Sequence, residues 1–129
     1  MKKVIILFSM LLFLNGCENA DTIEFNLQTK VGDNYEWIYE IEDESILIIE
    51  SLESELENTL NGSYTDYNFE FSALKKGVTN ITFNYIDENN DILHTMVYEI
   101  KVDALKNIKV IDKKGSYINK NLPIPEIDD

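Results

Sequence analysis

Residues 69–91 read FEFSALKKGVTNITFNYIDENND, and this stretch decides the fold class of the chain. Apolar and polar side chains alternate in it on both sides of a Lys75-Lys76-Gly77 corner. Alternation places the apolar side chains on one face of a half-buried β-strand, and glycine tolerates the backbone angles of a turn. The stretch therefore predicts two β-strands, joined either by a hairpin or by a crossing between two sheets.

The same pattern recurs in both directions along the chain. Further strands are expected at residues 22–28, 35–42, 46–50, 92–102 and 107–111. In residues 92–102, the side expected to face the core carries Ile92, Met96, Tyr98 and Ile100. From residue 115 onward, two prolines favour an extended or mobile tail.

Residues 51–60 leave three interpretations open. Leu52, Leu56 and Leu60 recur every four residues, and the glutamates between them favour a helix. An exposed loop or an irregular edge strand explains the same residues.

About seven short strands separated by turns are typical of an immunoglobulin-like antiparallel β-sandwich, so we expect an all-β fold. The chain has one cysteine, so no disulfide within it can hold the two sheets together. The core must rest on packing, and we expect Trp37 at its centre. The residues expected in the core are Trp37, Phe69, Phe71, Phe83 and Tyr85.

Composition limits the partners that the chain can bind. Its 129 residues suit one domain, and 24 acidic against 11 basic side chains give a formal charge of −13. Binding to nucleic acid requires a basic face that displaces counterions from the phosphates. We therefore expect no nucleic-acid partner and no electrostatic attraction to an anionic membrane surface.

The N-terminal residues have the organisation of a targeting signal. Lys2 and Lys3 precede an apolar run that is too short to span a bilayer comfortably. The run ends in Leu14-Asn15-Gly16-Cys17, which resembles the lipobox of bacterial lipoproteins. We expect a signal peptide at 1–16, lipidation of Cys17, a tether at 17–21, the sandwich domain at 22–111 and a tail at 112–129. A plain secretory signal with a buried or spare cysteine is the alternative.

The resemblance to a lipobox implies that the mature protein is extracytoplasmic and anchored to the cell membrane through Cys17. Two or three acyl chains hold a protein at a membrane durably, whereas one does so only marginally.

Catalytic patterns are not found in the sequence. His94 is the single histidine and lies within an expected strand, where a structural role is expected. Nucleophile elbows, P-loops, dinucleotide fingerprints and zinc-ligand spacings do not occur. We therefore expect a protein that is not an enzyme and that carries no cofactor.

The acidic residues 87–91 resemble the first half of a calcium-binding loop. An EF-hand would need glycine at the sixth position and glutamate at the twelfth, where this chain has Ile92 and Tyr98. We expect a solvated hairpin loop without a metal ion.

Four segments within residues 22–103 form a set: Tyr35-Glu36-Trp37, residues 69–77, residues 81–85 and residues 98–102. Together they resemble the chagasin-like family of cysteine-peptidase inhibitors. The first is similar to the aromatic-x-Trp of the family's second main strand, and the second to its F-x-F-x-A-x-x-x-G corner. The third looks like the strand beyond that corner, and the fourth fits the closing strand. The resemblance implies an immunoglobulin-like sandwich.

The resemblance also implies a function. Family members insert three loops into the cleft of a papain-like cysteine peptidase as a non-covalent wedge, and we expect a monomer that does the same. The corresponding contact residues are Gly32, Asp33, Asn34, Tyr35, Gly62, Ser63, Tyr64, Asp87, Glu88, Asn89 and Asn90. These loops lack the family's N-P-T-T-G and R-P-W sequences, and a non-inhibitory immunoglobulin-like surface binding module is the alternative.

Overall fold

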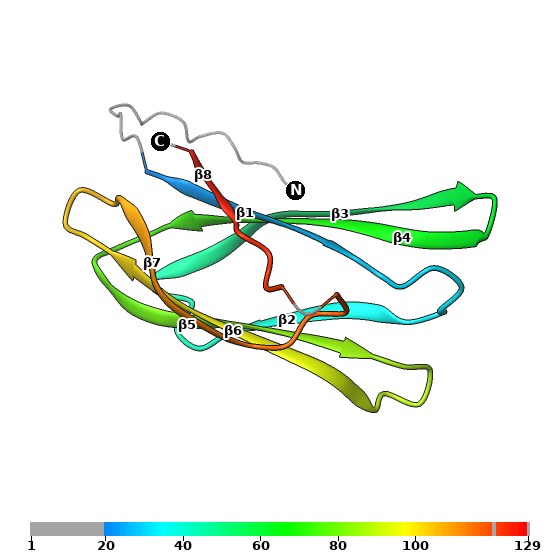
Figure 1. Cartoon of the computed structure of the whole chain (residues 1–129). Helices are drawn as coiled ribbons and strands as arrows, with labels where there is room; N and C mark the ends of the chain where they lie inside the picture. The colour runs from blue at the N-terminus through cyan, green and yellow to red at the C-terminus, as the bar shows by residue number, and fades with distance from the viewer. Residues whose placement is uncertain (1–19, 120, 129) are drawn as a thin grey trace.

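The computed structural model describes residues 20–119 and 121–128 and consists of two antiparallel β-sheets packed face to face (Figure 1). The first sheet has the strand order β3-β4-β1-β8, and the second has the order β2-β5-β6-β7. The strands are β1 (Thr22–Gln28), β2 (Glu36–Ile41), β3 (Leu47–Thr59), β4 (Gly62–Ala73), β5 (Gly77–Ile86), β6 (Ile92–Val102), β7 (Ile108–Gly115) and β8 (Glu126–Asp128). The expected all-β, immunoglobulin-like sandwich is confirmed.

The stretch that decided the fold class forms β4 and β5, which belong to different sheets. The Lys75-Lys76-Gly77 corner is therefore a crossing between sheets, and the hairpin interpretation is wrong. A Cβ atom on Gly77 would lie 2.5 Å from Cδ1 of Ile46, a buried residue that packs beneath the corner. Glycine allows the chain to pass this close to the core.

The centre of the core is a group of aromatic rings contributed by both sheets. The ring of Phe25 in β1 lies 4.8 Å from the rings of both Phe83 and Tyr98, measured between centroids. Such tilted and edge-on pairs add to the stabilisation from buried area. All five expected core residues are buried. Trp37, however, packs near one end of the sandwich against Tyr85 and Tyr117, so its expected central place was wrong.

Residues 51–60 fall almost entirely within β3, an edge strand of 13 residues. The helix and the loop are therefore wrong, and the edge-strand interpretation is confirmed. A spacing of four residues suits a strand as well as a helix, because it is twice the strand period. The register of β3 against β4 shifts between Ile49 and Ser51, which leaves Glu50 as a bulge.

Ile92 does not lie on the core side of β6 as expected, because a second bulge shifts the register at the start of this strand. Ile86 pairs with Ile92 and Tyr85 pairs with His94, so Leu93 is left over. The bulge turns the start of β6 outward, and Ile92 is 59% exposed although Met96 further along the strand is buried.

The C-terminal segment packs on the sandwich, where the sequence suggested an extended or mobile tail. β7 continues to Gly115, and the side chain of Tyr117 is buried between the sheets. The hydroxyl group of Tyr98 donates a hydrogen bond of 2.6 Å to the carbonyl of Pro123. β8 then pairs with β1, with Ile127 opposite Ile23.

One end of the sandwich is closed by a buried carboxylate. Asp21 is 4% exposed, and its Oδ2 accepts a hydrogen bond of 2.8 Å from the N–H of Ile108. Its backbone N–H donates to Lys106, and its carbonyl accepts from Ala73. We call this end, with its loops at 42–46, 74–76 and 103–107, the far end.

The expected signal peptide, Cys17 and most of the expected tether lie outside the described residues. Within residues 20–119 and 121–128, the structure contains no helix with the length and hydropathy needed to cross a membrane.

Candidate functional site

Three connections lie at the same end of the sandwich, opposite the far end (Figure 1). They are the first loop (residues 29–35), the hairpin turn (residues 60–61) and the third loop (residues 87–91). Strand pairing explains this arrangement, because Gln28 at the end of β1 lies opposite Asp66 near the start of β4. Glu36 at the start of β2 likewise lies opposite Ile86 at the end of β5. We call this region the three-loop end.

The first loop lies between the other two connections, and its backbone is tied to the β3–β4 hairpin. The N–H of Gly32 donates a hydrogen bond of 2.9 Å to the carbonyl of Ser63. Thr29, which is 3% exposed, donates from its N–H to the carbonyl of Thr65 and accepts the N–H of Thr65 at its hydroxyl oxygen. These bonds hold the first loop against the base of the hairpin turn.

Tyr85 of β5 holds the first loop from below. Its hydroxyl oxygen accepts the N–H of Lys30 at 2.9 Å, and its O–H donates to the carboxylate of Asp33 at 3.2 Å. Burial raises the pKa of Tyr85 to about 12, and the neighbouring charge of Asp33 acts in the same direction. The phenol is therefore neutral at physiological pH and able to make both bonds.

Two further buried aromatic residues fix the point where β1 leads into the first loop. Nε1 of Trp37 donates to the carbonyl of Gln28, and the hydroxyl oxygen of Tyr117 accepts the N–H of Gln28, both at 2.9 Å. The indole ring of Trp37 lies 4.9 Å from the ring of Tyr85 and 5.5 Å from that of Tyr117. This aromatic support positions the backbone of the first loop before any partner binds.

The third loop is held by its own carboxylate. Oδ1 of Asp87 accepts hydrogen bonds of 2.9 Å from the N–H groups of Asn89 and Asp91. Asn90 has a φ angle of 67°, a left-handed conformation that asparagine tolerates. An oxygen that a calcium ion would require is thus used to fold the loop. No cluster of metal-binding side chains occurs among the residues that the structure describes.

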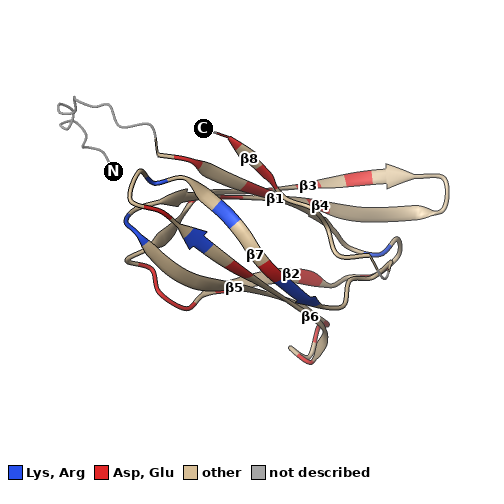
Figure 2. Ribbon diagram, turned by 60° about the vertical axis from the view of Figure 1, so that its left-hand side comes forward, with Lys and Arg blue, Asp and Glu red and all other residues tan. Residues whose placement is uncertain are grey.

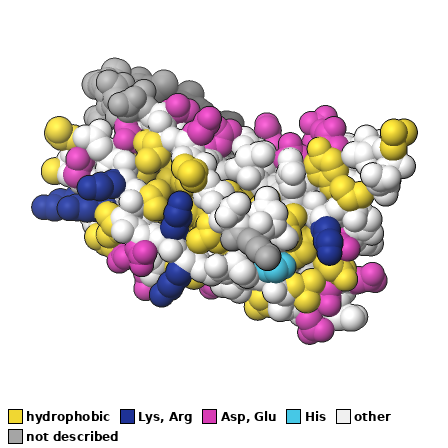
Figure 3. All heavy atoms as spheres, viewed as in Figure 1, with side chains coloured by type: hydrophobic (Ala, Val, Ile, Leu, Met, Phe, Trp, Pro, Cys, Tyr) yellow, Lys and Arg dark blue, Asp and Glu magenta, His cyan; other side chains and the backbone are white. Residues whose placement is uncertain are grey.

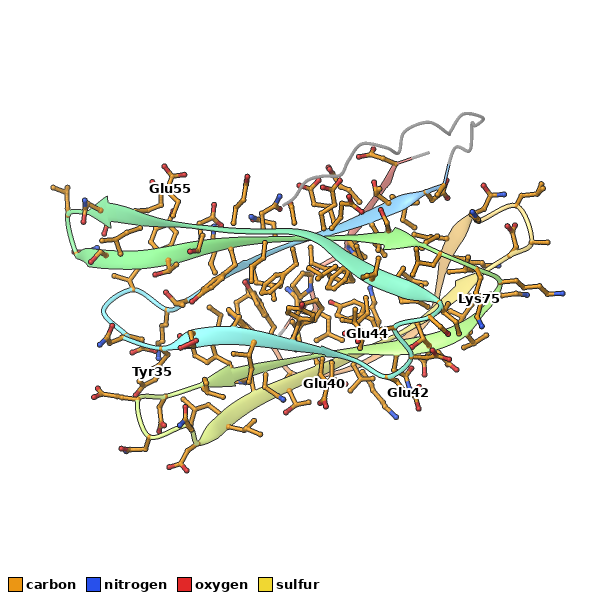
Figure 4. All side chains as sticks on the ribbon, turned by 180° about the vertical axis from the view of Figure 1, so that it is seen from behind. Tyr35, Glu40, Glu42, Glu44, Glu55 and Lys75 are labelled. Carbon is orange, nitrogen blue, oxygen red and sulfur yellow. The ribbon has the colours of Figure 1, made fainter. Side chains whose placement is uncertain are left out.

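The structure brings the expected contact residues to this one end but does not expose them equally. Asp33, Tyr35, Ser63, Tyr64 and Asp87 are half-buried. The ring of Tyr35, labelled in Figure 4, makes an edge contact with Tyr85 at 5.7 Å. The exposed members of the set are Gly32, Asn34, Gly62, Glu88, Asn89 and Asn90.

Sequence reasoning missed several residues that matter at this end. Leu60 at the hairpin turn is fully exposed, and Val31 and Leu93 are 43% and 46% exposed. A lone apolar residue beside a turn was the only available signal. Thr29 and Tyr117, which support the first loop, gave no signal because their partners are distant in the sequence.

His94 lies beneath the third loop and has a local structural partner. Its Nδ1 is 3.0 Å from Oγ of Ser116, and its ring lies 5.8 Å from that of Tyr85. The first contact connects β6 to the segment that follows β7, and the second connects β6 to β5.

Comparison of the chain with protein-family models, with curated proteins and with solved structures finds no match. The resemblance to chagasin-like inhibitors therefore rests on the sequence motifs, and the function it implies is a proposal.

Proposed function

We propose that the protein is a lipid-anchored, extracytoplasmic inhibitor of papain-like cysteine peptidases and that its three-loop end enters the peptidase cleft. The observation that supports this proposal is that three separate connections lie at the same end of the sandwich. The first loop lies in the middle, joined to the hairpin through Gly32 and Ser63 and to β5 through Tyr85.

Rigid support of the loops favours tight binding without covalent chemistry. A loop that is already ordered loses little conformational entropy when a partner binds it. The backbone of the first loop is fixed at Thr29, Lys30 and Gly32 by hydrogen bonds to neighbouring strands and loops. The third loop is fixed by Asp87.

The exposed apolar side chains at the three-loop end supply the contact area for such a wedge. Leu60 projects from the hairpin turn with its whole side chain in solvent, and Val31 lies on the neighbouring first loop. Transfer of a leucine side chain from water into a protein cleft is favourable by about 1.5–3 kcal/mol. We expect Leu60 to be a principal contact.

Inhibition assays with the purified protein and a panel of papain-like peptidases test this proposal. We expect inhibition at submicromolar concentration, and we expect Leu60→Asp to weaken it by about tenfold or more, given the energy of burying a leucine. Leu105→Asp is the matched control, because Leu105 is 79% exposed in a loop at the far end. Inhibition absent across the panel at micromolar concentration, or weakened equally by both variants, contradicts the proposal.

The anchor is tested separately. In bacterial cells fed a labelled fatty acid, we expect label on the wild-type chain and none on a Cys17→Ser variant, which should leave the membrane fraction. Label retained by the variant contradicts anchoring at Cys17.

A second candidate is a non-inhibitory surface binding module on the same scaffold. It is favoured by the third loop, whose Asp87 side chain is directed to its own backbone. This candidate predicts a folded protein that inhibits no peptidase of the panel.

A further inference from the structure

β3 has a free edge that is unusually long. The strand runs for 13 residues, whereas about 5–6 are typical, and its one strand neighbour within the described part of the chain is β4. In an edge strand, every second residue directs its N–H and C=O groups away from the sheet. These groups are a template on which a further strand can pair.

The two faces of β3 beyond its bulge carry different side chains. Glu53, Glu55 and Glu57 lie opposite Asn68, Asp66 and Tyr64 on the outer face of the sheet. Figure 4 shows Glu55 pointing away from the second sheet. Leu52, Ser54 and Leu56 alternate with these glutamates on the inner face, and the two leucines are 49% and 64% exposed. The strand therefore presents an acidic row on one face and two exposed leucines, separated by a serine, on the other.

The acidic row continues across the sheet. The four strands of this sheet contain no lysine, whereas β6 and β7 of the other sheet do, as Figure 2 shows. Figure 3 shows acidic and hydrophobic side chains close together over the part of the molecule that carries β3. The acidic residues in the sheet's strands are Glu24, Glu50, Glu53, Glu55, Glu57, Asp66, Glu70, Glu126 and Asp128.

We propose that the free edge of β3 binds an extended, basic segment of a partner protein, which joins the sheet as an additional strand. Charge identifies the occupant, because the glutamates of two β3 edges would repel each other if two copies paired here. A basic segment instead places positive charges beside Glu53, Glu55 and Glu57. This surface runs along the side of the first sheet and borders the three-loop end only at Glu57, opposite Tyr64. The proposal therefore goes beyond peptidase inhibition.

The geometry also specifies the sequence pattern of the partner. Paired strands lie about 4.8 Å apart, and their side chains alternate between the two faces. Along the added strand, every second side chain meets the acidic row, and the others meet Leu52, Ser54 and Leu56. The partner segment should therefore alternate lysine or arginine with apolar residues.

A labelled peptide that alternates lysine and valine is a direct probe, with binding to the purified protein measured by fluorescence anisotropy. A peptide of the same composition, with its lysines and valines in separate blocks, tests whether the alternation matters. Two further peptides carry backbone N-methyl groups on all lysines or on all valines. N-methylation removes backbone N–H donors but keeps the charge and the side chains. In the bound peptide, the N–H groups of one residue type point toward β3 and those of the other point away. We therefore expect one of the two N-methylated peptides to lose binding and the other to keep it.

Charge variants of the protein locate the site. We expect the isosteric triple variant E53Q/E55Q/E57Q to bind the alternating peptide about tenfold more weakly, from three lost ion pairs. The matched control is E36Q/E40Q/E42Q, which removes three charges at and beside β2, the edge strand of the other sheet. Figure 4 labels two of these residues, Glu40 and Glu42.

Two results would overturn the proposal. One is equal binding of all the peptides, which would indicate general attraction between opposite charges. The other is an equal loss of affinity in both triple variants, which would remove β3 as the site. Inhibition of a peptidase by E53Q/E55Q, which keeps Glu57 opposite Tyr64, should be unchanged, and this separates the outcome from that of the proposed function.

Discussion

The two ends of the sandwich are closed in different ways. At the three-loop end, Trp37, Tyr85 and Tyr117 reach from the core to hydrogen-bond the backbone of residues 28 and 30. At the far end, the buried carboxylate of Asp21 binds the N–H of Ile108, and its backbone binds Ala73 and Lys106. One end is supported by large aromatic rings and the other by the short side chain and backbone of Asp21.

The difference shows two ways to order the end of a sandwich, one by large side chains that reach out from the core and one by a short side chain that is itself buried. Aromatic side chains combine a large apolar body with a polar tip, so they can stabilise a loop from inside and leave its outer surface free. A short carboxylate has no such reach, and Asp21 must itself be buried in order to bind Ile108. The contrast predicts that each end can be loosened separately.

The largest expected effect comes from Trp37→Ala. Loss of a buried indole typically costs about 3–5 kcal/mol of unfolding free energy, because a cavity remains. The carbonyl of Gln28 also loses its Nε1 donor. Urea denaturation measures the loss of unfolding free energy. In hydrogen-exchange measurements, the exchange rate should increase more, relative to wild type, at the N–H of Lys30 than at the N–H of Ile108. Equal acceleration at both ends contradicts separate closure.

Asp21→Ala should have an intermediate effect at the opposite end. The N–H of Ile108 would stay buried without an acceptor, which costs about 1–3 kcal/mol. Asp21→Asn is the matched control, because its amide oxygen can still accept this hydrogen bond. Thermal unfolding should rank the proteins in the order wild type, Asp21→Asn, Asp21→Ala, and peptidase inhibition should survive in all three.

Tyr85→Phe should have the smallest effect on stability, about 1 kcal/mol for a hydrogen-bonded hydroxyl group. It removes the bonds to Lys30 and Asp33 but keeps the ring, so hydrogen exchange at Lys30 should accelerate without global unfolding. Unchanged exchange at Lys30 would show that Tyr85 does not hold the first loop.

Tyr85→Phe should also change how the stability of the protein depends on alkaline pH. Burial raises the pKa of Tyr85 from 10.0 to about 12, which means that the neutral phenol is favoured in the folded state. Its contribution to stability is fully present below pH 10 and is lost as the pH rises through about 12. Absorbance of the phenolate and circular dichroism should show a less pronounced alkaline transition in Tyr85→Phe.

Much of the fold could be predicted from the sequence because alternation reports burial directly. Phe69, Phe71, Phe83 and Tyr85 are buried as expected. Alternation fails where a bulge shifts the register, as at Glu50 and Leu93. Bulges depend on pairing with a partner strand, so a single segment does not reveal them.

The residues that hold the first loop in place were harder to predict from the sequence. Tyr117 follows a polar stretch and acts on Gln28, 89 positions earlier in the chain. Thr29 and Thr65 pair through backbone groups that every residue has, although the hydroxyl of Thr29 adds one bond. Contacts of this kind follow from the three-dimensional arrangement of the strands.

The length of β3 also fixes the separation between the two ends of the first sheet. β3 begins with Leu47 paired to Ala73, which binds Asp21, so it starts at the far end. Its 13 residues span roughly 43 Å at about 3.3 Å per residue. With the chain anchored at Cys17 as proposed, the length of β3 sets the distance between the far end and the hairpin turn. Insertion or deletion of residue pairs in both β3 and β4 would change this distance in steps of about 6.6 Å while each side chain keeps its face.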